Sequence, residues 1–262
     1  MIRPTRILSS FFVAQVFVAC LLVASVLLLA APALAGGKPA DKPSTVVDEG
    51  TFAVFLNGRQ VATETFTIRQ YADSSITSSQ LHLESGTGGG SLEQSCELVL
   101  HADASLTRYE WKQISPNRSS AVVEPSNDFL SMHTVEADGK VSDLPFFLTP
   151  TAFILDDYFF STREVLLWRY LASGCKQRPD GDGCDLVRSR FAVLVPRRRT
   201  SSEVYIEFKG FEDTPLNGRP QHLRHFLMQT DGADWHLWLD SNYKLLRISI
   251  PDHNTEVLRQ EK

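Results

Sequence analysis

The sequence predicts a mainly β protein with one main helix, in which an antiparallel curved sheet or half-open barrel wraps around a buried helix. Three observations support this fold class. Short segments of alternating apolar and polar residues recur along the chain, turn pairs such as Asn-Gly separate several of them, and one apolar stretch begins with helix-capping residues. Ten or more short strands with turns between them are typical of an antiparallel barrel or sandwich.

Alternation of apolar and polar positions locates the strands, because successive side chains of a strand point to opposite faces. Asn-Gly and Asp-Gly pairs between such runs are strong hairpin signals. The clearest strands cover residues 52–56, 60–68, 92–100, 106–114, 191–195, 204–208, 235–239 and 246–250, and the turn pairs begin at Asn57, Asp138, Asn217 and Asp231.

The helix is predicted from Ser161 up to Gly174, which terminates it. Ser161 and Glu164 have the spacing of a capping box, in which each side chain bonds the backbone amide of the other residue. The residues that follow are apolar on nearly every side, so the helix is expected to be buried.

Residues 1–35 have the pattern of a secretory signal peptide: Arg3 and Arg6, an apolar run over residues 11–31, and small residues before a cut after Ala35. An uncleaved membrane anchor and a lipidated Cys20 are the alternatives. Cleavage is favoured, which predicts a periplasmic or secreted protein. Residues 36–48 would then form a flexible tether, and residues 49–262 a single antiparallel β-barrel-like domain.

The chain has 262 residues, 43% hydrophobic and 22% charged, which excludes a disordered tail, a collagen-like fibre and a multi-span membrane protein. Removing residues 1–35, which carry two arginines and no acid, changes the net charge from −5 to −7 and leaves 227 residues. This acidic balance disfavours nucleic acid as a partner and allows only transient contact with membranes. The basic run 197–199 is interpreted as a solvated turn, with a phosphate or lipid head-group contact as the alternative.

The cysteines of the exported part predict one disulfide. Cys175 and Cys184 flank a short polar loop, and a bond between them would contribute roughly 2.7 kcal/mol by restricting the unfolded chain. Cys96 lies on a leucine-rich strand face and is expected to be a buried thiol, with pairing to one of the other two cysteines as the alternative.

The sequence predicts no metal site and no cofactor. His222 and His225 would point to opposite faces of a strand, His236 is isolated, and the acidic loop 180–185 lacks the closing glutamate of a calcium loop. No nucleophile elbow, zinc-protease motif or phosphate-binding loop occurs, so no catalytic residue is assigned and an enzyme is disfavoured. A triad or carboxylate pair assembled from distant strands remains open.

Four tryptophans, sixteen phenylalanines and an apolar helix beside a curved sheet predict an apolar ligand site. Trp111, Trp168 and Trp238 are the candidate lining residues. The alternative is that these aromatic side chains simply fill the core, as buried aromatics commonly do.

The export segment, the opening strand and turn over residues 51–58, the segments 155–158 and 166–170, and the closing segments 238–240 and 245–248 together resemble uncharacterised bacterial exported proteins. Their pattern is similar to the lipoprotein-carrier type of open β-barrel. This resemblance implies an incomplete antiparallel barrel closed by a helix, together with a lipid or acyl ligand. It identifies no functional residue.

The predicted function is that of a periplasmic or envelope protein that binds or carries a lipid-like apolar ligand in a half-barrel cavity. One alternative is an envelope hydrolase acting on a glycan or ester. The other is a non-catalytic structural partner of another envelope protein.

Overall fold

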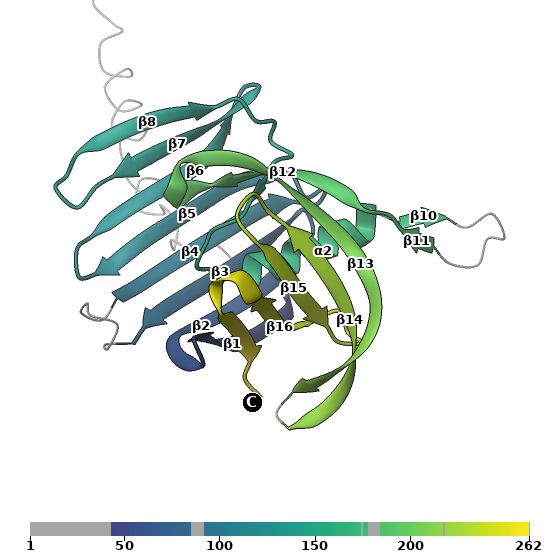
Figure 1. Ribbon diagram of the computed structural model, residues 1–262. Helices are drawn as coiled ribbons and strands as arrows, with labels where there is room; N and C mark the ends of the chain where they lie inside the picture. Colours follow the sequence, from purple (N-terminus) through teal and green to yellow (C-terminus); the bar gives the residue numbers. More distant parts are fainter. Residues whose placement is uncertain (1–42, 85–91, 174, 178–183, 217, 262) are drawn as a thin grey trace, which may run out of the picture. The chain divides into compact units, whose positions relative to one another are not determined.

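A single continuous sheet of fifteen strands dominates the part of the chain that the structure describes (Figure 1). The computed structural model describes residues 43–84, 92–173, 175–177, 184–216 and 218–261, with backbone alone at 175–177 and 184–185. From one edge to the other, the strand order is β8-β7-β6-β5-β4-β3-β2-β1-β17-β16-β15-β14-β13-β12-β9. Nearly every strand therefore pairs with a neighbour in sequence, and this confirms the predicted fold class.

Eight successive antiparallel strands make the first half of the sheet, which is the purple-to-teal wall in Figure 1. Their apolar side chains alternate with polar ones, so that one face is buried. The strands are β1 (Thr45–Leu56), β2 (Arg59–Gln70), β3 (Ser74–Leu83), β4 (Leu92–His101), β5 (Leu106–Ser115), β6 (Ser119–Ser126), β7 (Phe129–Val135) and β8 (Val141–Phe146).

The second half continues from β1 through the last strand of the chain, because β17 pairs with β1. Its pairs are antiparallel except at the edge, where β9 runs parallel to β12. The strands are β9 (Phe153–Ile154), β12 (Ser189–Val195), β13 (Thr200–Leu216), β14 (Arg219–Gln229), β15 (Asp234–Leu239), β16 (Leu245–Ile250) and β17 (Thr255–Arg259); β10 (Cys175–Gln177) and β11 (Cys184–Leu186) form a separate pair.

The helix α2 (Ser161–Ser173) contacts both halves of the sheet, as the buried-helix prediction requires. The Ser161 hydroxyl lies 2.7 Å from that of Ser79 on β3. At the other end, the Tyr170 hydroxyl accepts a hydrogen bond from the backbone of Phe208 on β13, and its ring packs edge-on against Phe226 on β14. The curved sheet thus wraps around the helix.

The turn pairs behave differently from one another. Asn57 and Gly58 both have positive φ, at 51° and 76°, which is the backbone form that makes Asn-Gly a tight hairpin. At the next pair Gly139 alone has positive φ. Asn217 lies outside the described residues, and the turn at Asp231 is closed by hydrogen bonds between Thr230 and Ala233.

Strand β1 begins at Thr45, inside the segment for which a flexible tether was expected. Residues 45–48 pair with the end of β2, and Asp48 is fully buried. The predicted signal peptide and most of the tether fall outside the described residues. Within the described part of the chain, no helix combines the length and the apolar character needed to cross a membrane.

Candidate functional site

The interior of the curved sheet contains a pocket of about 820 Å³. Apolar side chains from both halves of the sheet form its walls, among them Leu81 on β3, Val193 on β12, Val204 on β13 and Ile250 at the end of β16, all of them buried. Pockets of roughly 300–1,000 Å³ with mainly apolar walls are typical of small-molecule sites. This pocket is therefore the candidate functional site.

The two ends of the pocket are polar. Arg163, on the first turn of α2, lines the pocket and is only 1% exposed, so it marks the buried end. Arg198 and His253 line the opening, where the Arg198 side chain is 63% exposed. An elongated ligand with an apolar body would match the walls, and polar groups at either end could bond it.

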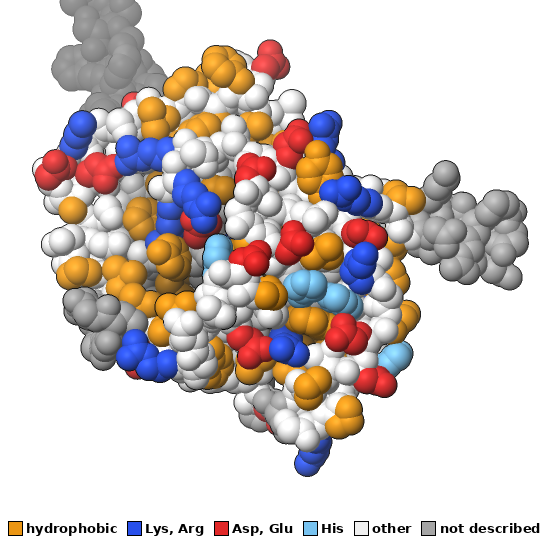
Figure 2. All heavy atoms as spheres, viewed as in Figure 1, with side chains coloured by type: hydrophobic (Ala, Val, Ile, Leu, Met, Phe, Trp, Pro, Cys, Tyr) orange, Lys and Arg blue, Asp and Glu red, His pale blue; other side chains and the backbone are white. Residues whose placement is uncertain are grey.

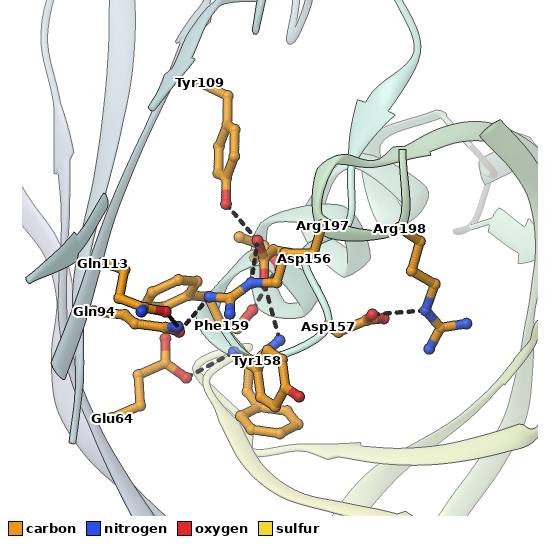
Figure 3. A network of polar contacts seen from close by, with 12 residues as sticks. Glu64, Gln94, Tyr109, Gln113, Asp156, Asp157, Tyr158, Phe159, Arg197 and Arg198 are labelled. Carbon is orange, nitrogen blue, oxygen red and sulfur yellow. Dashed lines mark hydrogen bonds and ion pairs between the residues drawn. The ribbon is translucent and has the colours of Figure 1, made fainter. Parts of the chain in front are cut away.

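The segment that leads into α2 is anchored by one buried carboxylate, Asp156 (Figure 3). Tyr109 on β5 donates its hydroxyl hydrogen to Oδ2 at 2.7 Å, and Arg197 Nε lies 3.0 Å from Oδ1 and 3.2 Å from Oδ2. The backbone N–H of Tyr158 also bonds Oδ1. Burial, followed by the Asp156 charge, raises the pKa of Tyr109 well above its usual value. Tyr109 therefore remains a neutral donor.

Arg197 joins this anchor to the opposite wall of the sheet. Its guanidinium lies over the rings of Trp111 and Tyr158, at 4.7 and 4.4 Å, and it donates to the side chain of Gln94 on β4. Its side chain is only 13% exposed. The solvated-turn interpretation of the basic run is thus wrong at Arg197, because its partners come from β4, from β5 and from the loop before α2, all distant in sequence. The solvated-turn interpretation does fit Arg198, whose side chain is more exposed.

A side chain from strand β2 caps the beginning of α2, and the predicted capping box does not form. The carboxylate of Glu64 on β2 accepts hydrogen bonds from the N–H groups of Phe160 and Ser161, at 2.7 and 3.2 Å. Burial raises the pKa of Glu64 to about 7, although these bonds act in the opposite direction. Glu164 cannot reach back to Ser161, because its side chain is buried beside Asp48 and Arg259.

A second buried ionic cluster ties the start of β1 to the end of β17. Asp48 accepts two hydrogen bonds from Arg259 at 2.7 Å and one from Lys244 at 2.6 Å. Burial opposes the ionised form, yet these bonds lower the pKa of Asp48 to about 2. Burial and the Asp48 charge raise the pKa of Glu164 well above its usual value. Of the two neighbouring carboxyl groups, Glu164 is therefore protonated and Asp48 is ionised.

A pair of histidines occupies the outer face of the sheet, where Figure 2 shows a group of pale blue side chains. His225 on β14 lies 2.9 Å from His236 on β15, between ring nitrogens, and its other nitrogen lies 3.1 Å from Glu212. His236 is therefore not isolated, because strand pairing brings it beside His225. Among the described residues, no three metal-ligating side chains gather in one place.

The three tryptophans predicted to bind ligand do not share a pocket. Trp111 packs under Arg197, Trp168 on α2 donates to the backbone of Tyr243, and Trp238 belongs to a small cluster with Leu216 and Leu223. Their assignment to ligand binding stays a prediction. Trp235, which the sequence analysis did not select, lines the large pocket. Trp235 and Trp238 lie three residues apart in β15, so their side chains point to opposite faces of the sheet. The alternation of the strand could therefore have distinguished them.

The buried-thiol prediction for Cys96 is confirmed: the residue is 4% exposed and its thiol is free. Burial raises the pKa of the Cys96 thiol well above its usual value. The side chains of Cys175 and Cys184 lie outside the described residues, so their disulfide stays a prediction. Their backbones belong to the β10–β11 pair, in which Cys175 faces Leu186 and Cys184 faces Gln177.

No protein-family model and no curated protein matches the chain. Among solved structures, it is similar to a beta-barrel-like protein of the domain of unknown function DUF1849 from Brucella abortus. That match has 7% identity and a TM-score of 0.50, and it covers 82% of this chain and 97% of the other. A DUF1089 family protein from Pseudomonas aeruginosa gives 12% identity and a TM-score of 0.42, over 72% and 90% of the two chains. The first match supports a barrel-like fold; a relationship to lipoprotein carriers stays a prediction.

Proposed function

We propose that the protein is an exported envelope carrier that binds a lipid-like ligand in the apolar pocket inside its curved sheet. The observation that supports this most directly is the pocket itself, about 820 Å³ and walled by side chains such as Val193 and Val204. Filling it with a ligand would remove apolar surface from water on both sides, which is the main driving force for binding a lipid chain.

The first measurement is how the affinity of a ligand depends on the length of its hydrocarbon chain. Each methylene group buried in the pocket contributes about 0.8 kcal/mol, which is roughly a fourfold gain in affinity. We expect Nile red, a neutral apolar dye, to bind the purified protein with increased fluorescence. Octanol, decanol and dodecanol should displace it with affinity that rises along the series. No Nile red binding, or displacement independent of chain length, would contradict the proposal.

A matched pair of variants locates the binding. Ser202 lines the pocket on β13, whereas the next residue, Glu203, has a side chain 48% exposed and ion-paired with Arg190. Ser202→Phe should fill part of the pocket and weaken Nile red binding. Glu203→Phe adds the same ring to the same strand and should leave binding unchanged, since an exposed ion pair contributes little to stability. Equal loss in both variants would place the dye elsewhere.

Export is tested separately. The protein should be recovered from the periplasm without residues 1–35, and N-terminal sequencing should begin at Gly36. Native mass spectrometry of that material should show a co-purifying lipid mass. An uncleaved chain in the membrane fraction would instead support the anchor alternative.

A further inference from the structure

Arg163 carries a positive charge on the buried wall of the apolar pocket, and the described residues give it no carboxylate at ion-pair distance. The charges of Asp157, Asp156 and Glu64 act on it from farther away. The side chain is 1% exposed. Among the described residues, no carboxylate lies within 4.0 Å of its guanidinium, although ten other arginines and lysines have such a partner. A buried charge without a paired opposite charge is unusual and points to a functional role.

The Arg163 guanidinium contacts two aromatic rings and two backbone carbonyl groups, and one of its nitrogen donors has no hydrogen-bond partner. Its Cζ lies 5.3 Å from the centroid of the Phe160 ring and 4.7 Å from that of the Trp235 ring. Nη1 donates to the carbonyl oxygens of Asp156 and Phe159. Nε has no hydrogen-bond partner. Phe160, Trp235 and Arg163 all line the pocket, so the guanidinium lies at the pocket wall.

The acids of the neighbourhood are already engaged. Asp156 is bonded by Arg197, and Asp157 lies 2.7 Å from Arg198. Glu64 accepts the amide hydrogens at the beginning of α2. The other acid that lines the pocket is Asp231, in an exposed turn. None of these carboxylates therefore pairs with Arg163.

We propose that Arg163 binds the anionic head group, a carboxylate or phosphate, of the ligand whose chain fills the pocket. This inference rests on the proposed function. The donor edge of a guanidinium matches both head groups, and such charge-assisted bonds are stronger in a site that excludes water. An anion there would give the Arg163 guanidinium the close negative partner that no described carboxylate supplies. The neighbouring Phe160 and Trp235 rings would help to hold the guanidinium in one orientation.

The test compares three probes with the same chain: dodecanol, dodecanoate and dodecyl phosphate, each displacing Nile red at pH 8. In the unmodified protein, at least one anion should bind about tenfold more tightly than the alcohol, as expected when a charged hydrogen bond is added. Dodecanoate and dodecyl phosphate separate the two head-group chemistries. Inorganic phosphate alone should not displace the dye.

Variants assign the preference to Arg163. Arg163→Met should abolish the preference for anions while dodecanol still binds, and Arg163→Lys should retain part of it. Arg190→Met, whose side chain is 64% exposed and lies outside the pocket lining, is the matched control and should keep it. If Arg163→Met does not fold, the comparison in the unmodified protein and in Arg163→Lys still decides.

The outcomes are distinguishable. Equal affinity for all three probes in the unmodified protein would overturn the head-group assignment and leave the proposed function standing. An anion preference that persists in folded Arg163→Met, or disappears in Arg190→Met alone, would also overturn it. Failure to bind Nile red or any probe would overturn the proposed function itself, and the head-group assignment with it.

Discussion

The carboxylate of Glu64 lies 2.7 Å from the backbone nitrogen of Phe160, and this contact ties strand β2 to the beginning of the helix inside the sheet. The same helix turn carries Arg163 into the pocket. The position of the proposed ligand-binding arginine therefore depends on a carboxylate ninety-nine residues earlier in the sequence. Burial raises the pKa of that carboxylate to about 7.

Glu64 should make stability depend on pH between about 4.5 and 7. Because its folded-state pKa is above its unfolded value of 4.5, the folded protein binds the proton more tightly. Its contribution is therefore complete below pH 4.5 and is lost as pH rises through 7, by about 3 kcal/mol in total. Urea unfolding from pH 4 to 8 should show this decline in the unmodified protein and a shallower one in Glu64→Gln. Parallel curves for the two proteins would contradict the assignment.

Replacing Asp48 or Glu164 by its amide should change the stability of the fold by very different amounts. Asp48→Asn leaves Arg259 and Lys244 without their buried partner and should cost about 3 kcal/mol or more in unfolding free energy. Glu164→Gln replaces a carboxyl that its raised pKa already keeps protonated, so we expect a change below about 1 kcal/mol. Chemical denaturation of both variants at pH 7 measures this. The reverse order of effects would show that the charge lies on Glu164.

The neighbours Arg197 and Arg198 provide a matched pair. Arg197→Met leaves Asp156 buried without its cation and should destabilise the fold by about 3–5 kcal/mol. Arg198→Met removes an exposed ion pair with Asp157 and should cost no more than about 1 kcal/mol. Thermal unfolding followed by circular dichroism compares them. Similar losses in the two variants would mean that the Asp156 anchor contributes little.

Cys96 should react with a thiol reagent only when the protein unfolds. It is 4% exposed, and burial holds its pKa well above the usual value, so little thiolate is available. In a Cys175→Ser, Cys184→Ser background, labelling in native buffer should be at least about 1,000-fold slower than in urea, if opening requires most of an unfolding free energy of 5 kcal/mol or more. Fast labelling of the folded protein would show that β4 opens locally.

Much of the architecture could be predicted because it depends on local patterns. Alternation placed β4, β5 and β15, and Gly174 marked the end of α2. The capping-box prediction failed because an alternative acceptor, Glu64, arrives from a distant strand. The lining of the pocket could not be predicted. Its residues come from β1 to β3, from β12, β13 and β15 to β17, and from the segment that leads into α2, and a sequence pattern does not say which of these elements face each other.

By itself, the sequence determined that the chain forms short antiparallel strands around one apolar helix, because side-chain alternation and turn chemistry act between near neighbours. Only the tertiary structure decided which polar groups are buried together. Asp156 meets Arg197, Glu64 meets the amides of α2, and Arg163 meets no acid. The reason is physical: the free energy of a buried charge depends on partners that the curvature of the sheet brings within a few ångströms.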